Sequence, residues 1–595
     1  MNTVLPVTAA ARHLGDRSMA GGIADLVRIA GWSVCLALLL LAYGYGLGNI
    51  PLLNYTEGLY AEVAREMLAG GSWIIPHLDG SVYLDKPPLF YWLEAGSFAL
   101  FGLHAWTARL VSALAALAGC VGVWLVTARL GLARIGRWAA LILAGMPGWL
   151  LMAHTASFDA LLATLIAGSL LGFFAADLTG RIGWARWGYA LAALGYLTKG
   201  PVAPVLVGAT MLVFLAWEGR LRDVWRLLDP WGIGVFFVVA GPWTVLAALR
   251  EPDFLSHFFL VEQFGRYLGT RRPVDYGSGP LWYYLPWITA AAAPWILVGP
   301  LARWQAGAPP AGSERRLARF GIAWAATVVV FFSFSVDKGN YYILPALPGI
   351  ALAAAGALRR WFDMPWSARR RLVLAPVPLC VLFAAAATPL LWRGYGWLAM
   401  GVVAGIALAL LGWTLAARNR RAAVAMSLVA LVPVATGAFA SLGTAAPLQR
   451  SQRLARVIQH SPHPQAPVVL YRHYDPFGAL PFLLQRRVWV LQPHSAELYF
   501  AARWQPRRRP FLRRRGLAAL LRRGPVWILA STRYRPELLR QLPADCTRTR
   551  THPGAAGRLM FMLPTCPRLV TRTPNPRLVK PRLRLATLRH MRRSC

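Results

Sequence analysis

The 595-residue chain has few acidic residues and very few lysines. Aspartate and glutamate together number 24, against 63 lysines and arginines, which gives a formal net charge of +39. The lysines are Lys86, Lys199, Lys338 and Lys580, so arginine supplies almost all of the positive charge. Cysteine is also scarce, with six residues, and this excludes a small scaffold held together by many disulfides.

Sequence motifs that mark common cofactors are missing. The chain has no P-loop, no HExxH, no Cys/His spacing of a zinc site and no Asp-x-Asp pair. The glycine pattern GYGLGN lies within an apolar segment, where glycine favours helix packing rather than nucleotide binding. The sequence therefore leaves the cofactor unknown, and the use of a divalent cation stays open.

Long apolar segments dominate what is present. Hydrophobic residues make up 57% of the chain, and the mean hydropathy is +0.45. Apolar runs of about 17–22 residues recur and are long enough to cross about 30 Å of hydrocarbon. The predicted fold class is an α-helical polytopic membrane protein with about 13 transmembrane helices. The predicted spans are 30–48, 106–128, 137–152, 159–176, 187–198, 201–217, 231–249, 281–301, 319–335, 341–358, 373–392, 396–416 and 422–441.

Arginines predict the orientation of these spans. Short cytoplasmic loops collect lysine and arginine, and every second loop here is rich in arginine. Residues 1–29 are therefore predicted to be cytoplasmic and to lead into a retained anchor, and 30–441 form the transmembrane domain. Loops 49–105 and 250–280 are predicted to face outward. An odd number of spans places residues 442–595 outside as well.

The polar C-terminal part is predicted to form a separate domain. Alternating helix and strand patterns over 442–566 indicate a small periplasmic α/β domain. Cys546 and Cys566 either pair there in an oxidising compartment or stay free thiols. Residues 567–595 are rich in proline and arginine and are predicted to be a disordered basic tail. Outside the cytoplasm such a tail suits anionic lipid head groups rather than nucleic acid.

The outward loops hold most of the candidate functional residues. After Thr56, apolar residues recur at helical spacing and predict an amphipathic helix along the membrane surface, with Glu57 at its start. The structural alternative is that Thr56 caps this helix and Glu57 is a favourable charge at its N-terminus. Asp159 likewise either caps a helix or is a functional ionisable group at the membrane boundary.

Cations lie in the same outward loops. Two prolines keep Lys86 of YLDKPP on extended backbone, Lys199 lies between two short spans, and Lys338 precedes another span. Arg266 lies one turn from Glu262 in a second interfacial helix, at the spacing of an ion pair. The placing of the three lysines reflects either chance or a need for a compact point charge. For Lys338, anchoring at the interface is a further alternative.

This combination of charges points to a reaction on a lipid-linked phosphate. Carboxylates can take a proton from a hydroxyl or an amine, while lysine and arginine stabilise a phosphate, above all a leaving one. Aromatic residues such as Trp73, Tyr91 and Trp282 suit sugar rings or lipid chains, although an interfacial aromatic belt explains them equally. The charged residues gather at one face, which favours surface chemistry over a transporter or flippase for a lipid-linked or anionic solute.

Several sequence blocks resemble one enzyme family, in the family's order. They are TEGLYAEVAREM, GSWIIPHLDGSVYLDKPPLFYW, FDALL, YLTKGP, FFLVEQFGRYL, GPLWYYLPW and KGNYYILPALPGIAL. They are similar to motifs of the GT-C class of membrane glycosyltransferases, within the superfamily of bacterial aminoarabinose (lipid A) transferases and protein O-mannosyltransferases. The resemblance covers residues 30–350 well and the remaining spans loosely.

The resemblance implies inverting transfer of a sugar from a polyprenyl (undecaprenyl) phosphate donor. The acceptor would be a lipid A-like lipid or another extracytoplasmic molecule, at the outer face of the bacterial inner membrane. The residues implied are Glu57 and Asp159 as catalytic acids, Lys86, Lys199, Arg266 and Lys338 as donor-phosphate contacts, and Tyr60, Glu262 and Tyr341 as further cavity residues.

The chain departs from the family pattern at one catalytic position. Thr56 stands where the family has its leading Asp, and a threonine hydroxyl does not act as a base at neutral pH. Either Glu57 has taken over that role, or Asp159 carries it, or the acceptor chemistry differs. A non-catalytic relative that serves assembly is a further alternative.

Overall fold

The computed structural model describes most of residues 37–364 and 450–563. The gaps within these ranges are 38, 272–276, 294, 306–309, 495–496, 499–500, 503–509, 543–549 and 555–557. Several predictions fall outside the described residues: the segments 1–29 and 567–595, the last three predicted spans, Cys546 and Cys566.

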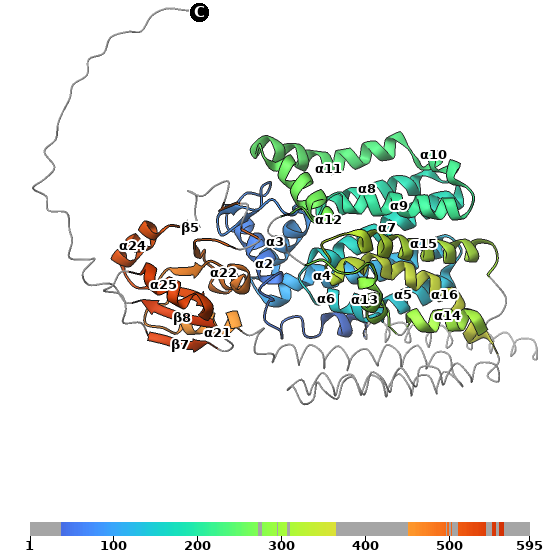
Figure 1. Cartoon of the computed structure of the whole chain (residues 1–595). Helices are drawn as coiled ribbons and strands as arrows, with labels where there is room; N and C mark the ends of the chain where they lie inside the picture. Colours follow the sequence, from blue (N-terminus) through green and yellow to red (C-terminus); the bar gives the residue numbers. More distant parts are fainter. Residues whose placement is uncertain are drawn as a thin grey trace, which may run out of the picture.

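The N-terminal two thirds of the described chain form a helical bundle, seen in blue to yellow in Figure 1. Its longer helices are α4 (Ala105–Arg129), α7 (Phe158–Thr179), α8 (Ile182–Lys199), α9 (Val202–Trp217), α11 (Pro230–Arg250), α15 (Gly312–Phe334) and α16 (Leu347–Asp363). Shorter elements are α5 (Ala133–Ala144), α6 (Pro147–Ala153), η1 (Leu221–Asp223), α10 (Val224–Leu227), the π-helix η2 (Ser256–Gly265), α12 (Arg266–Leu268), η3 (Leu281–Tyr283), α13 (Tyr284–Ala291), α14 (Trp295–Gln305) and η4 (Asn340–Ala346).

Five helices among the described residues are long and apolar enough to cross a membrane, or six if α5 and α6 form one span bent by 66°. The chain is therefore a multi-pass membrane protein with an α-helical fold. The predicted span 137–152 is broken because Pro147 cannot continue the hydrogen bonding of α5. The predicted span 281–301 is likewise divided, between η3 with α13 and the separate helix α14. The described residues do not establish the full number of 13 helices.

Helix α7 lies at the centre of the bundle. Of the most apolar stretch of α7, 78% is buried, and the helix packs along α8 and α4. At Gly172 an added Cβ would lie 2.8 Å from the carbonyl oxygen of Trp184, so glycine permits the two helices to approach closely. The two aspartates of this buried helix therefore lie near its opposite ends, with Asp159 in the first turn and Asp177 near the last.

The first long loop folds into a compact unit. It contains α2 (Glu57–Leu68), the two-stranded hairpin of β1 (His77–Leu78) and β2 (Ser81–Val82), and α3 (Leu89–Phe101). The predicted surface position of α2 is wrong, because Glu62 and Glu66 on its polar side are buried with exposed fractions of 0% and 4%. Protein rather than water or head groups covers that side of the helix.

The C-terminal part is built on a six-stranded sheet with the order β5-β4-β3-β6-β8-β7. Strands β3 (Val468–Tyr471), β4 (Trp489–Leu491), β5 (Phe511–Leu512) and β6 (Val526–Ser531) are parallel, while β7 (Arg550–Gly554) and β8 (Arg558–Leu563) are antiparallel. The helical elements of this part are α21 (Arg450–Gln459), η5 (Asp475–Phe477), α22 (Leu480–Leu484), α24 (Arg514–Arg523), η6 (Thr532–Tyr534) and α25 (Arg535–Gln541).

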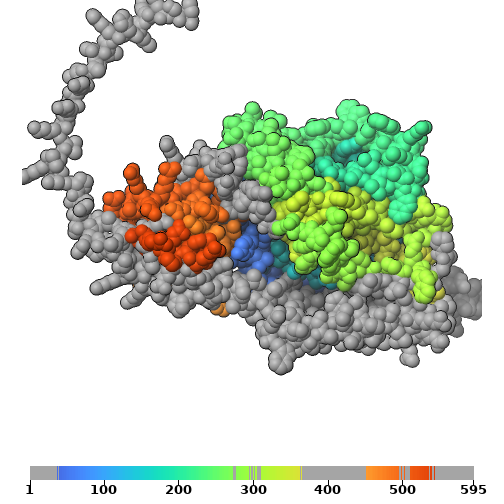
Figure 2. Space-filling model, in the orientation of Figure 1, coloured from blue at the N-terminus to red at the C-terminus, as the bar shows by residue number. Residues whose placement is uncertain are grey.

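The C-terminal domain packs directly against the first loop. In Figure 2 the blue loop lies between the orange and red domain and the green and yellow bundle. Apolar side chains from α2, α3 and the sheet share one buried cluster, which includes Leu59, Val63 and Leu470. At Gly58 an added Cβ would lie 2.3 Å from the Cα of Ala479, so the backbones of the two parts touch there.

Replacing this glycine is expected to disrupt the interface. Because Gly58→Ala puts a methyl group into the backbone of Ala479, it should lower the free energy of unfolding by about 1–3 kcal/mol. Thermal unfolding of the purified full-length protein in detergent measures the loss. Gly96→Ala in α3 is the matched control, since an added Cβ there meets nothing within 4 Å. An equal effect of both substitutions would contradict the proposed close contact.

Candidate active site

A cavity of about 320 Å³ opens where the first loop, the helical bundle and the C-terminal domain meet. Its charged lining residues are Lys86, Asp159, Lys199, Glu262, Arg266 and Glu497. Its aromatic lining residues are Tyr60, Phe158, Phe264, Tyr267, Phe331, Phe332, Tyr341 and Tyr342. Most of the site residues predicted from the sequence therefore lie around one cavity, although Tyr60 and Tyr341, the first and last of them, are 281 positions apart.

Asp159 and Lys199 form an ion pair on one wall. Asp159 lies in the first turn of α7, after the cap position Ser157, so it is not the helix cap. Lys199 is the last residue of α8, and Gly200, with φ +81°, lets the chain turn away there. The Lys199 ammonium lies 2.6 Å from Oδ1 of Asp159 and over the rings of Tyr341 and Tyr342, at 5.2 and 4.9 Å.

Lys86 approaches the cavity from non-helical backbone, as the following prolines predict. Its ammonium donates to the carbonyl oxygen of Asp85 at 3.2 Å. An ammonium has three donors, so this contact leaves capacity for a bound anion. Lys86 is the cavity lysine for which the structure gives no carboxylate partner among the described residues.

Arg266 enters from the end of the π-helix η2. It lies 2.7 Å from Glu262, at the predicted i,i+4 spacing, and 3.6 Å from Asp337. Burial by itself would raise the pKa of Glu262, but the guanidinium groups of Arg266 and Arg271 outweigh it and hold the pKa well below its usual range. Glu262 therefore stays ionised and holds Arg266 at the cavity wall rather than acting as a proton acceptor.

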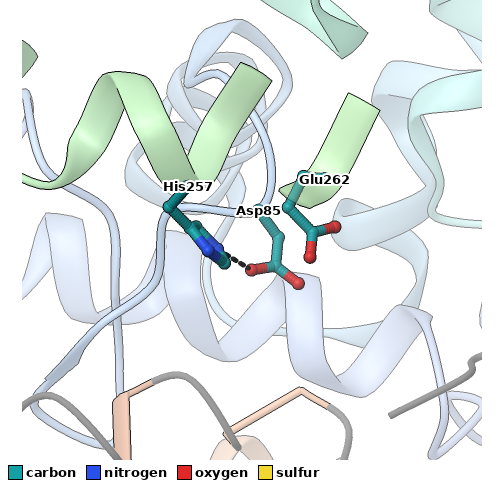
Figure 3. Close-up of side chains that lie close together, drawn as sticks. All are labelled: Asp85, His257 and Glu262. Carbon is teal, nitrogen blue, oxygen red and sulfur yellow. Dashed lines mark hydrogen bonds and ion pairs between the residues drawn. The ribbon is translucent and has the colours of Figure 1, made fainter. Parts of the chain in front are cut away.

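Asp85, His257 and Glu262 form a second group of polar side chains, with Asp85 between the other two (Figure 3). His257 Nε2 lies 3.3 Å from Asp85, and ligand atoms of Asp85, His257 and Glu262 are all within 4.8 Å of one another. This donor set suits a divalent metal. However, the Arg271 guanidinium lies 2.6 Å from Glu262 and 3.5 Å from Asp85. Because Arg271 bridges both carboxylates and Arg266 also pairs with Glu262, two guanidinium groups balance the two carboxylates, and the group fits an ion-pair network better than a metal centre.

Glu57 does not line the cavity. Its carboxylate pairs with the buried Arg109 of α4 at 2.6 Å and accepts from the backbone N–H groups of Leu53 and Ala156, each at 2.8 Å. The side chain of Thr56, at the cap position of α2, makes no capping hydrogen bond. The geometry thus favours a structural role for Glu57 over the catalytic one implied by the family resemblance.

Lys338 also lies outside the cavity lining. Its ammonium donates to the carbonyl oxygens of Phe332, Ser333 and Ser335 at 3.4, 2.5 and 2.7 Å. Burial lowers the pKa of Lys338. All three donors are used at the C-terminal end of α15, where a cation is favourable, so Lys338 holds this turn rather than a ligand.

Sequence reasoning missed Glu497. This residue follows β4 in the C-terminal domain, lines the cavity, and accepts a hydrogen bond from the hydroxyl of Tyr83 at 2.7 Å. No motif surrounds it, because the contact depends on how the domain packs against the first loop. Asp85, Arg109 and Arg271 were missed for the same reason, since each acts through a partner distant in sequence.

The fold of this polytopic membrane protein is similar to that of membrane glycosyltransferases of the GT-C type. Residues 85–246 match the family described as dolichyl-phosphate-mannose-protein mannosyltransferase. The chain is similar to a crystal structure of ArnT from Cupriavidus metallidurans bound to undecaprenyl phosphate, with 26% identity and a TM-score of 0.77. That match covers 89% of this chain and 98% of the other, and the resemblance seen in the sequence motifs is confirmed.

The curated relatives are also named as transferases that use undecaprenyl phosphate. An undecaprenyl phosphate-alpha-4-amino-4-deoxy-L-arabinose arabinosyl transferase 2 from Pseudomonas fluorescens (strain Pf0-1) is 31% identical over 54% of this chain. A corresponding transferase 1 from strain Pf-5 of that species is 32% identical over 54% of this chain. The chain spans 58% and 59% of the length of these two relatives.

Neutralising Glu57 is expected to cost stability first. Glu57→Gln leaves the Arg109 guanidinium buried without its counter-ion, which should cost about 3–5 kcal/mol of unfolding free energy. The double variant Glu57→Gln/Arg109→Met removes both charges and should recover much of it. Thermal unfolding in detergent measures both. Full stability of Glu57→Gln with complete loss of activity would instead make Glu57 part of the chemistry.

Proposed function

We propose that this chain is a glycosyltransferase that moves a sugar from a polyprenyl (undecaprenyl) phosphate to a lipid A-like lipid or another extracytoplasmic acceptor. The observation that carries the proposal is the convergence of Lys86, Lys199 and Arg266 with Asp159 on one cavity. The names of the curated relatives, and the undecaprenyl phosphate bound to the similar crystal structure, support the same donor class.

The arrangement of charge along α7 supports chemistry at one face of the membrane. Asp159 belongs to the cavity, whereas Asp177 pairs with Arg220 and Arg316 near the other end of the helix. At 1.5 Å per residue these two aspartates are roughly 27 Å apart, close to the thickness of the hydrocarbon. A transporter would need available polar groups between these two layers. The stretch of α7 between them carries no charged residue, and the hydroxyls of Thr164 and Ser169 donate to backbone carbonyls of neighbouring helices.

The proposal includes an orientation in the bacterial inner membrane. The cavity faces the periplasm, and the arginine-rich end at Arg220 and Arg316 faces the cytoplasm with residues 1–29. The domain at 442–566 lies on the periplasmic side because Glu497 lines the cavity. The transmembrane domain 30–441, with the outer loops 49–105 and 250–280, holds the remaining site residues.

The cavity offers separate places for the parts of a lipid-linked donor. Lys86 suits the phosphate best, and Arg266 and Lys199 support it, because carboxylates already hold both of these cations. Apolar side chains such as Leu162, Val205 and Phe331 line the same space and suit the first isoprene units of a polyprenyl chain. The sugar would then lie between the phosphate and the carboxylates.

The reaction is an inverting displacement. The acceptor oxygen or nitrogen attacks the anomeric carbon, the bond from that carbon to the phosphate oxygen breaks, and the acceptor proton passes to a carboxylate. The polyprenyl phosphate leaves with both bonding electrons. Lys86 and Arg266 stabilise the negative charge that develops on the leaving phosphate, and this lowers the activation barrier.

Asp159 is the proposed proton acceptor. Its carboxylate lines the cavity, and the Lys199 ammonium at 2.6 Å holds it in place at the cavity wall. Glu57 acts as a positioning residue, because its contact with the N–H of Ala156 fixes the segment that leads into Asp159. Glu497 orients the acceptor from the side of the C-terminal domain.

Removing the proposed phosphate contact should slow transfer strongly. Lys86→Met is expected to lower the transfer rate by about 10²–10³-fold, because the leaving phosphate loses a charged donor. The assay uses a synthetic polyprenyl-phosphate aminosugar and lipid A, with products read by mass spectrometry. Lys338→Met is the matched lysine control and should lower thermal stability while the KM for the donor stays unchanged. A transfer rate of Lys86→Met equal to that of the wild type would contradict the proposed phosphate site.

Asp159 and Glu497, two of the three carboxylates that line the cavity, should affect different kinetic constants. Asp159→Asn is expected to lower kcat by about 10²–10⁴-fold, since the acceptor proton loses its destination. Glu497→Gln keeps a polar side chain and should mainly raise the KM for the acceptor. Steady-state kinetics with varied donor and acceptor distinguish the two effects. A kcat loss confined to Glu497→Gln would assign the base to the C-terminal domain instead.

A further inference from the structure

Three buried carboxyl groups gather where the first loop meets the C-terminal domain, away from the cavity. Glu62 and Glu66 lie on α2, and Asp79 lies in the turn between β1 and β2. One oxygen of each lies within 4.8 Å of the others, and their exposed fractions are 0%, 4% and 0%. Three negative charges this close in a buried place repel one another strongly.

The two glutamates have partners. Arg65 donates to both oxygens of Glu62, at 2.6 and 2.7 Å. The N–H of Gly80 donates to both oxygens of Glu66, at 3.0 and 3.1 Å. Arg487 of the C-terminal domain reaches Glu66 at 3.4 Å, but its side chain is 55% exposed and compensates the charge weakly.

Asp79 is the least compensated of the three. Its Oδ1 accepts from the N–H of Val488 at 2.8 Å, which ties the hairpin to the C-terminal domain. Its Oδ2 is buried near the buried hydroxyl of Tyr474, which is the group placed to donate to this carboxylate, and neither atom has another hydrogen-bond partner among the described residues. Asp79 also has φ +51°, which an aspartate adopts at some cost.

The charges do not balance without one more cation. The groups that face the cluster are Glu62, Arg65 and Glu66 from α2, His77 from β1, Asp79 from the turn, and Tyr474 and Arg487 from the C-terminal domain. Burial lowers the pKa of His77, so this imidazole is neutral near pH 7. Three carboxylates against two guanidinium groups leave a net charge of about −1 in this count.

We propose that this cluster is a proton-binding site, with the proton on Asp79, and that it makes the contact between the first loop and the C-terminal domain sensitive to pH. A neutral carboxylic acid removes the excess charge and supplies an O–H donor for a neighbouring carboxylate. No extra space is needed, because a proton occupies none. Burial raises the pKa of Glu62 as well, but Arg65 donates to both of its oxygens, and a protonated carboxyl accepts poorly at its hydroxyl oxygen, so Asp79 is the better place for the proton.

The direction of the pH effect follows from linkage. Burial, followed by the charge of Glu66, raises the pKa of Asp79 to about 7 when the domain is docked, from the ordinary value of 3.8. Undocking exposes Asp79 and releases the proton, so the docked state binds more protons between these two values. Docking is therefore tightest near pH 4, weakens as the pH rises toward 7, and changes little above 7.

This site would act on catalysis at a distance. The domain that contacts Asp79 through Val488 also carries Glu497 into the cavity a few residues later. Loosening the contact at higher pH would withdraw a cavity residue without touching Lys86 or Asp159. The proton site itself does not depend on the proposed transferase activity, and its test needs no substrate.

Hydrogen exchange of the full-length protein in detergent tests the site. Exchange is measured at pH 5, 6, 7 and 8, corrected for the intrinsic pH dependence, over peptides that cover 57–85 and 468–491. Protection in the wild type should fall by up to roughly tenfold per pH unit between pH 5 and 7 and then level off. Asp79→Asn resembles the protonated acid and tolerates the same backbone, so its protection should stay high and lose this slope.

Two further variants keep the test decisive. Glu66→Gln removes a different negative charge from the same cluster, so it should also flatten the pH dependence of protection. It provides the test if Asp79→Asn does not fold. Glu537→Gln, in the same domain but paired with Arg472, is the matched control and should keep the slope. An unchanged slope in Asp79→Asn would overturn the proposal. So would one equivalent of divalent metal in the purified wild type that Asp79→Asn lacks, because a metal ion would then be the missing cation.

Discussion

The buried ion pair between Glu57 and Arg109 is the interaction on which the site depends. Arg109 also donates to the carbonyl oxygens of Leu47, Ile50 and Pro51, so one guanidinium joins the end of the first apolar segment to α4. Glu57 extends this connection to the backbone just before α7. The first loop, α4 and the start of α7 are therefore fixed by one pair of opposite charges, and the position of Asp159 follows from it.

The cavity is assembled from parts that fold for different reasons. Helix α7 is held by close packing against α8, and Glu497 comes from a sheet domain. Lys86 comes from non-helical backbone, Lys199 from the last residue of α8, and Arg266 from the residue that follows the π-helix η2. Carboxylates hold the cations Lys199 and Arg266 in place, whereas Lys86 keeps donors available. The difference in their partners, more than their charge, separates the supporting cations from the one best suited to the proposed donor phosphate.

Much of this arrangement can be read from the sequence, because short motifs specify local structure. Prolines after Lys86 keep its backbone non-helical, the glycine after Lys199 ends α8, and the spacing of Glu262 and Arg266 gives their ion pair. Long-range partners carry no local signal. Arg109 lies in an apolar span 52 positions after Glu57, so sequence motifs suggested a catalytic role for Glu57. Glu62 and Glu66 looked like a polar helix face because the domain that covers them is hundreds of residues away.

The backbone contact between Gly58 and Ala479 restricts how such proteins can exchange parts. A C-terminal domain taken from a relative would bring its own side chain at the position of Ala479 and its own partner for Asp79. Such a domain would fit only if α2 and the β1–β2 hairpin of the same relative were transferred with it. The first loop and the C-terminal domain therefore form one structural unit that is discontinuous along the sequence, so the two parts would have to be exchanged together.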